Sequence, residues 1–179
     1  MNKLILWDLD NTIVNSLHRS RHNEDGSLDI GYFNSYAVPD NVNRDHLIYP
    51  MVDLVKYFMN RSDCYNIVIT SRFRGDQDKD FFDKRGLFFD DFLYRGHALM
   101  GEKIMLKNVL SDFQLKDLLL EEYLKSSKFE LGFGFDDKPE NLKVFADKGF
   151  TPFNANDINH FKIDIAEVQK AFDDKYGSL

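Results

Sequence analysis

Short apolar runs alternate with helical patterns along this chain of 179 residues, and that alternation restricts the folds open to it. The apolar runs, each bounded by turn residues, are typical of buried strands at 3–7, 66–70, 89–94, 131–135 and, more weakly, 150–153. Helical patterns occur between and after them at 47–59, 115–124, 139–148 and 163–176. Strands that alternate with helices pair in parallel. The sequence therefore predicts an α/β fold, a Rossmann-like parallel sheet with helices on both faces.

One segment departs from this rhythm. Residues 15–45 are rich in Asn, Asp, Ser, Gly and His, and they separate the first strand from the first strong helix. Loops of this length inside a domain are usually functional or disordered. The aromatic residues Tyr32, Phe33 and Tyr36 favour a folded lid. We therefore expect a single domain over 1–179 with a small cap insertion at about 15–45.

Charge and cysteine content narrow the possible functions. The formal charge of -7 argues against broad, non-specific binding of nucleic acid. The single cysteine, Cys64, cannot form an internal disulfide, and its place before an apolar run predicts a packed thiol. We find neither a membrane-spanning run nor a secretory signal pattern. A cytoplasmic protein with no evident obligatory protein partner is the expectation.

Two aspartates follow the first strand. Asp8 and Asp10 share one face of an extended chain and lie where α/β sheets bind their ligands. A cation such as Mg²⁺ relieves the repulsion between such carboxylates, and aspartate is an established nucleophile in phosphoryl transfer. The alternative is a surface turn, because Asp-Asn-Thr is also ordinary turn chemistry.

Other polar residues follow later strands. Thr70 and Ser71 end the second strand, where their hydroxyls can donate to phosphoryl oxygens, although both residue types also cap helices. Asp136 and Asp137 end the fourth strand, so that Asp136 can join Asp8 around Mg²⁺, while Asp137 can instead cap the next helix. A lysine near the start of a helix between these strands can reach a phosphate. Lys107 is preferred to Lys103 because it lies among apolar residues.

Taken in order, these segments resemble the haloacid dehalogenase superfamily over nearly the whole chain. The resemblance is strongest to the 3′-phosphatase domain of phage polynucleotide kinase and to small phage proteins similar to it, on the segments 15–19, 70–72 and 136–138. Two positions depart from the pattern. Asn11 replaces a glycine, which is tolerable because Asn accepts left-handed backbone geometry. Lys138 stands where that family has arginine. No phosphate loop of a kinase occurs in the sequence.

The resemblance implies a role for each residue. It makes Asp8 the nucleophile that forms an aspartyl-phosphate and Asp10 the general acid and then base. Thr70, Ser71 and Lys107 would bind the phosphoryl group. Mg²⁺ would be held by Asp8, the main-chain carbonyl of Asp10 and Asp136. Asp137 would lie beside the metal, directly or through water, and Arg19 and Arg72 are possible substrate contacts.

The expected activity is that of a Mg²⁺-dependent phosphatase acting on a nucleotide or on the 3′ end of a polynucleotide. Free nucleoside monophosphates or other small phosphate esters are the alternative substrates, and the acidic charge favours them modestly. A catalytically silent module that binds phosphate or a partner is the alternative of another class.

Overall fold

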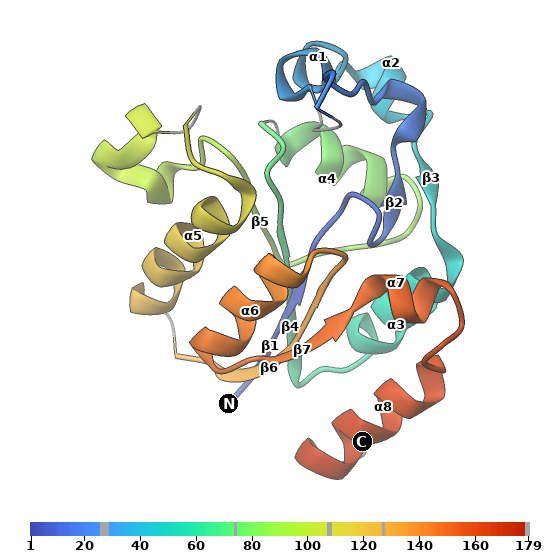
Figure 1. The fold of residues 1–179 in the computed structure, drawn as a ribbon. Coiled ribbons are helices and arrows are strands. Elements are labelled where there is room, and N and C mark those ends of the chain that lie inside the picture. Colours follow the sequence, from blue (N-terminus) through green and yellow to red (C-terminus); the bar gives the residue numbers. More distant parts are fainter. Residues whose placement is uncertain (26–28, 74, 107–108, 127, 178–179) are drawn as a thin grey trace.

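A five-stranded parallel sheet forms the centre of the computed structural model, which describes residues 1–25, 29–73, 75–106, 109–126 and 128–177 (Figure 1). Its strands lie in the order β5-β4-β1-β6-β7. Their bounds are β1 Lys3–Trp7, β4 Cys64–Ile69, β5 Asp91–Leu93, β6 Glu130–Asp136 and β7 Thr151–Asn154. All pair in parallel. The predicted α/β class is confirmed. Strand β5 is shorter than the predicted run at 89–94 because this edge strand pairs with β4 over three residues.

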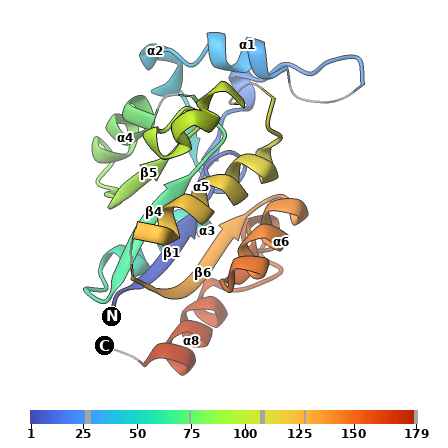
Figure 2. The same cartoon turned by 90° about the vertical axis from the view of Figure 1, so that its left-hand side faces the viewer.

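Helices cover both faces of the sheet. The helices of the α/β body are α3 Tyr49–Met59, α4 Gly75–Asp83, α5 Asp112–Ser126, α6 Pro139–Lys148, α7 Ala155–Asn159 and α8 Ile165–Tyr176. A 3-10 segment, Ala98–Leu106, precedes α5 and contains Lys103, which the sequence predicted to lie near the start of a helix. Figure 2, turned by 90° from Figure 1, shows α5 and α6 in front of the sheet. Helices α3 and α8 cover the opposite face of the sheet. Within the described residues, no helix is long and apolar enough to cross a membrane.

The alternation of side chains along β1 builds one core on each face. Leu4 and Leu6 join the cluster that contains residues of α5 and α6. Ile5 and Trp7 join the cluster that contains residues of α3 and α8. Because β1 is buried on both faces, it is a continuous apolar run up to Asp8, as expected of a central parallel strand.

The glycines of β6 allow close packing around this central strand. A Cβ at Gly132 would meet the backbone oxygen of Leu4 at 2.8 Å, and one at Gly134 would meet the Phe145 ring at 2.7 Å. Neither position has room for a side chain, so glycine is required by close approach and not by a turn. At the end of β6 the chain delivers Asp136 to the same edge of the sheet as Asp8.

The segment between β1 and α3 lies over that edge. It contains β2 (Val14–Asn15), a 3-10 turn (Leu17–Arg19), α1 (Ile30–Ser35), α2 (Pro39–Val42) and β3 (His46–Leu47). Strands β2 and β3 pair antiparallel and form its base. Figure 1 shows α1 and α2 at the top of the molecule, at the end of the sheet opposite the two termini. The segment is folded and lies above the carboxyl ends of the strands, where a lid over a ligand would lie.

Candidate active site

A pocket of about 410 Å³ opens between this lid segment and the carboxyl ends of the strands. Its walls combine predicted site residues, residues of the lid segment, and Arg95 and Asp112, which belong to neither group. The lining residues are Asp8, Asp10, Asn11, Ser16, Leu17, Ser20, His22, Phe33, Ser71, Arg72, Arg95, Asp112, Asp137 and Lys138. This is the crevice in which open α/β sheets bind their ligands. The volume is within the range of small-molecule sites.

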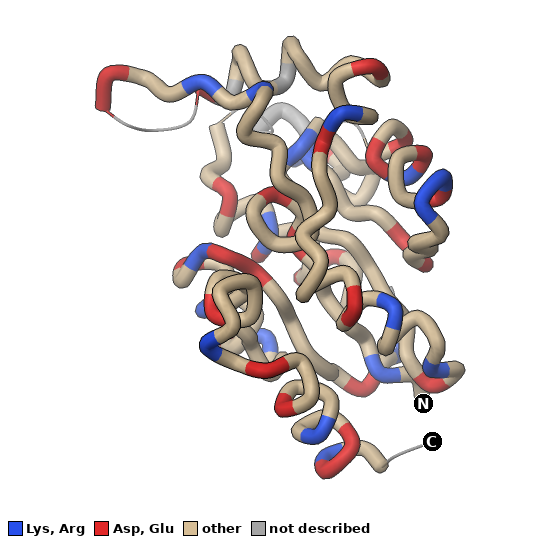
Figure 3. Tube along the Cα trace, turned by 90° about the vertical axis from the view of Figure 1, so that its right-hand side faces the viewer, with Lys and Arg blue, Asp and Glu red and all other residues tan. Residues whose placement is uncertain are grey.

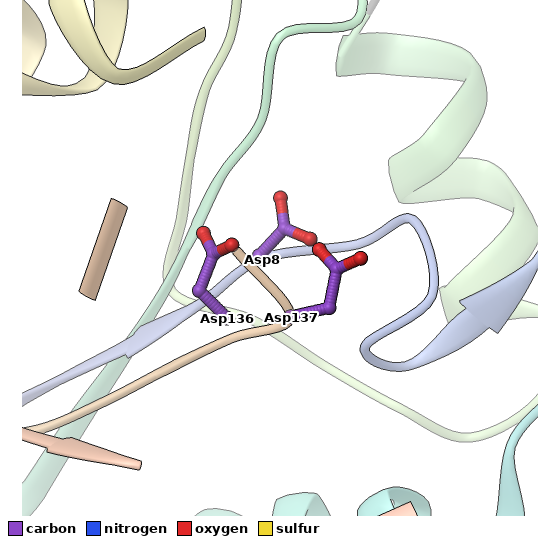
Figure 4. Close-up of side chains that lie close together, drawn as sticks. All are labelled: Asp8, Asp136 and Asp137. Carbon is purple, nitrogen blue, oxygen red and sulfur yellow. The ribbon is translucent and has the colours of Figure 1, made fainter. Parts of the chain in front are cut away.

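Three carboxylates meet at the floor of the site. Asp8, Asp136 and Asp137 each bring an oxygen to within 4.8 Å of the other two (Figure 4). Thr12 Oγ1 donates to Asp8 Oδ2 at 3.0 Å. Asn141 Nδ2 and the Lys138 backbone amide donate to Asp136 Oδ1, each at 2.9 Å. These bonds fix the carboxylates in place, as a site for a small cation requires.

A buried lysine outside the set of predicted site residues completes this group. Lys116 of α5 is fully buried, and its Nζ lies 2.6 Å from Asp8 Oδ1 and 2.6 Å from Asp136 Oδ2. Burial alone would lower the pKa of Lys116, but the two carboxylates raise it well above its ordinary value. Asp112, one turn earlier on the helix, lies 3.8 Å from the same Nζ. Lys116 is therefore held as a cation between two strand ends.

The donor set fits a hard divalent cation. Mg²⁺ prefers carboxylate oxygens and usually takes one or two of them with water and phosphate oxygens. Burial raises the pKa of Asp8, the negative charge of Asp136 raises it further, and Lys116 opposes both. Burial and Asp136 also raise the pKa of Asp137 to about 6. The carboxylates thus carry more negative charge than Lys116 offsets, which a bound cation would correct.

Asp10 belongs to a different set of contacts. Two nitrogens of the Arg72 guanidinium donate to the Asp10 carboxylate, Nη2 to Oδ1 at 2.7 Å and Nε to Oδ2 at 3.0 Å. Ser16 Oγ also donates to Oδ1. Burial would raise the pKa of Asp10, but the charge and hydrogen bonds of Arg72 hold it below its ordinary value. Asp10 is therefore kept ionised in the pocket wall, outside the Asp8 cluster.

Arg72 also connects Asp10 to the lid segment. Its Nη2 donates to Asp45 Oδ2 at 3.1 Å, and its Nη1 is paired with Asp78 of α4. Arg19 holds Asp45 with two further bonds of 2.9 Å, and its guanidinium lies 4.2 Å from the centre of the Phe33 ring. Arg19 is buried and paired with Asp45, whereas Arg72 lines the pocket. That both contact substrate stays a prediction.

The remaining predicted residues lie near this centre or outside the described residues. Ser71 lines the pocket, and Thr70 is buried beside it, with its Oγ1 accepting the Arg72 backbone amide at 3.2 Å. Lys107 lies outside the described residues. Lys103 is half exposed and lies 3.6 Å from Glu122. Among the described residues, the lysine that contacts both Asp8 and Asp136 is Lys116.

Asn11 adopts the backbone geometry expected of it. Its φ is 60°, in the left-handed region that Asn tolerates better than most residues. Its side chain reaches Asp137 Oδ2 at 3.4 Å, and Asn159 Nδ2 donates to the carbonyls of Asn11 and Thr12 at 3.2 and 3.0 Å. The turn after Asp10 is thereby tied to α7, which fixes the direction in which β1 delivers its aspartates.

Comparison with known proteins gives a clear sequence match. The family model described as bacteriophage T5 5′-deoxynucleotidase matches residues 1–177. The 5′-deoxynucleotidase of Escherichia phage T5 is 23% identical over 176 residues, a match that covers 89% of this chain and 69% of that protein.

Solved structures agree with the fold. A haloacid dehalogenase-like hydrolase, SP0104 from Streptococcus pneumoniae, superposes with a TM-score of 0.56 at 14% identity, covering 96% of this chain and 98% of that one. A chain of the Pnkp1/Rnl/Hen1 RNA repair complex superposes with a TM-score of 0.55 at 17% identity, covering 86% of this chain and 42% of that one. The predicted haloacid dehalogenase-like fold is confirmed.

Proposed function

We propose, because this chain belongs to the bacteriophage T5 5′-deoxynucleotidase family, that it removes the phosphate from deoxynucleoside 5′-monophosphates. The chain is a phosphatase-type hydrolase, as its sequence predicted. The observation that carries the proposal is Asp8, clamped by the buried cation Lys116 and lining a pocket of about 410 Å³. An aspartate at that position can attack a phosphate ester that enters the pocket.

The family favours free mononucleotides over the other substrate that the sequence left open, a polynucleotide 3′ end. The net charge of -7 supports the same choice, because long nucleic acid is bound through several basic contacts. The lid segment also gives the pocket a wall, formed by Leu17, His22 and Phe33, which suits a small ligand. Hydrolysis of a 3′-phosphorylated polynucleotide end stays a prediction.

In the proposed reaction a carboxylate oxygen of Asp8 attacks phosphorus, and the bond from phosphorus to the 5′ oxygen breaks. Asp10 gives its proton to that oxygen, so the nucleoside leaves as an alcohol. Water then attacks the aspartyl-phosphate, Asp10 takes the proton of the water, and the bond from phosphorus to Asp8 breaks. Inorganic phosphate is released and Asp8 is restored.

The contacts of Asp8 and Asp10 suit these roles differently. Lys116 and Thr12 each hold one oxygen of Asp8, which orients the carboxylate for attack. Arg72 keeps Asp10 ionised, which suits the base that activates water in the second step. For the first step Asp10 must gain a proton, and the fraction that carries it falls as the pH rises above its lowered pKa. We therefore expect ester cleavage to slow toward alkaline pH.

We further propose that Mg²⁺ is required and that Asp8, Asp136 and Asp137 hold it. When bound, the ion would supply positive charge against the negative charge that develops on the phosphoryl oxygens. The raised pKa values of Asp8 and Asp137 support this assignment, since a cation stabilises their ionised forms. The main-chain carbonyl of Asp10 stays a predicted ligand.

A substrate panel tests the proposal. Phosphate release is measured from deoxynucleoside 5′-monophosphates, 3′-monophosphates and an oligonucleotide with a 3′-phosphate, each with Mg²⁺ and with EDTA. We expect the 5′-monophosphates to be preferred and EDTA to stop release. A higher kcat/KM on the oligonucleotide would reject the mononucleotide as substrate. Release from no ester, together with measurable Mg²⁺ binding, would indicate the silent binding module instead.

A further inference from the structure

A second groove, of about 540 Å³, lies outside the active site. It is formed by the segment around β3, by α3 and by the chain just after α4, and it shares no lining residue with the active-site pocket. Its lining includes the basic residues Arg44, His46, Lys56 and Arg85. Figure 3 turns the side of β3 and α3 toward the viewer and shows Lys and Arg on separate segments of this face. Four basic side chains thus gather in one concavity of an acidic protein.

The basic side chains of this groove form no ion pair with the part of the chain that the structure describes. Among the residues that the structure describes, no carboxylate oxygen lies within 4.0 Å of a charged nitrogen of Arg44, Lys56 or Arg85. Asp45 lines the groove, but its carboxylate is buried and bound by Arg19 and Arg72. Within the described residues, the cationic donors of the groove therefore have no carboxylate partner of their own, which favours an anionic ligand.

One of these donors is already ordered. Arg85 Nη1 donates to the Phe81 carbonyl at 2.9 Å, and Nη2 donates to the Asn43 carbonyl at 3.0 Å. The guanidinium also lies 3.7 Å from the centre of the Phe81 ring. A guanidinium has five N–H groups, so these two bonds leave donors for a ligand. Because Arg85 is held across two segments, a ligand that binds it does not have to order it.

We propose that this groove binds a ligand with a chain of two or three phosphates, contacted by Arg44, Lys56 and Arg85. Three cations match such a chain better than a single phosphate, because each can pair with a different phosphate group. Tyr49, which is 68% exposed, also lines the groove and offers an aromatic face to a base. A nucleoside triphosphate therefore fits the lining better than inorganic tripolyphosphate, which shares the phosphate chemistry.

Calorimetric titration in EDTA tests the groove without turnover at the active site. The titrants are dATP and inorganic tripolyphosphate, and the variant is Arg44→Glu with Lys56→Glu. The control is Lys143→Glu with Lys170→Glu, which makes the same change in net charge on exposed residues of α6 and α8. We expect the groove variant to bind both titrants at least tenfold more weakly than the wild type and the control to bind them as the wild type does. In a separate assay with Mg²⁺, the groove variant hydrolyses 5′-monophosphates as the wild type does.

Three results would overturn the proposal: no binding by the wild type, equal binding by the groove variant, or an equal loss in the control. The milder change of Arg44→Gln with Lys56→Gln keeps the test valid if charge reversal disturbs folding. Tyr49→Ala separates the two sources of phosphate. If the ligand is a nucleotide, this variant binds dATP several-fold more weakly than the wild type and binds tripolyphosphate with unchanged affinity. An unchanged affinity for dATP would reject the nucleotide and leave the inorganic chain.

Discussion

Replacing Lys116 by Met removes the one buried cation that contacts both Asp8 and Asp136 in the described residues. The lysine is fully buried and lies 2.6 Å from each carboxylate, so the variant leaves two buried carboxylates without their shared partner. Removing one partner of a buried ion pair costs about 3–5 kcal/mol of unfolding free energy. We expect a loss of that size in the metal-free protein, measured by urea unfolding in EDTA at pH 8.

Two conditions should reduce that loss. Mg²⁺ adds positive charge at the same carboxylates, so it should stabilise the Lys116→Met variant more than it stabilises the wild type. Acid should also help, because removal of Lys116 raises the pKa of Asp8 further and a protonated carboxyl needs no partner. The difference between variant and wild type should therefore be smaller at pH 5 than at pH 8. A variant as stable as the wild type in EDTA at pH 8 would refute this reasoning.

Measurements of kcat distinguish the contributions of Lys116, Lys103 and Lys107 to the reaction. Loss of a fixed charge at the reacting group lowers kcat by about 10²–10³-fold, and we expect this of Lys116→Met on a deoxynucleoside 5′-monophosphate. The matched control is Lys103→Met, because Lys103 is a half-exposed lysine beside Glu122 and should change kcat little. Lys107→Met tests the lysine that the sequence favoured. A loss confined to Lys107→Met would show that the contact of Lys116 with Asp8 does not contribute to the reaction.

Three further results follow from the structure. The raised pKa of Asp137, about 6, leaves this carboxyl partly protonated at pH 6. Mg²⁺ binding should therefore release more protons at pH 6 than at pH 8, which calorimetry in two buffers measures. Equal proton release at the two pH values would count against Asp137 as a Mg²⁺ ligand. Gly132→Ala should lower the unfolding free energy by about 1–3 kcal/mol, because its Cβ meets the Leu4 carbonyl, whereas an unchanged urea midpoint would mean that β6 shifts freely. Phe161 is 82% exposed and has a φ of 57°, in the left-handed region that Asn tolerates better than Phe. Phe161→Asn should therefore raise the unfolding free energy by about 1 kcal/mol. A decrease would show that the ring itself stabilises the fold.

Strand ends were predictable from the sequence because an apolar run that stops at a polar residue is a local signal. Asp8, Thr70 and Asp136 each follow such a run, and parallel strands bring their carboxyl ends to one edge. Lys116 carries a weaker signal, since it lies next to Leu115 and within the helical pattern predicted at 115–124. A lysine within an apolar helix, four residues after Asp112, indicates a buried charge that needs partners.

The contacts of Arg72 could not be read from the sequence in the same way. Its partners Asp10 and Asp45 lie 62 and 27 residues away along the chain. Only the folded lid segment brings them together, and no local pattern marks Asp45 as the residue that joins lid and site. Composition alone suggested an insertion at about 15–45, and its role as a lid stays a prediction, whereas its connection to Asp10 depends on tertiary structure.

Substitution of Asp8 by Asn tests the central claim most directly. Asn keeps the size of the side chain and can still accept from Thr12 or Lys116, so the protein should fold, which an urea unfolding curve checks. An amide cannot attack phosphorus as a carboxylate does. We predict that Asp8→Asn releases no measurable phosphate from a deoxynucleoside 5′-monophosphate in Mg²⁺. Turnover by folded Asp8→Asn protein at a rate near that of the wild type would contradict the account.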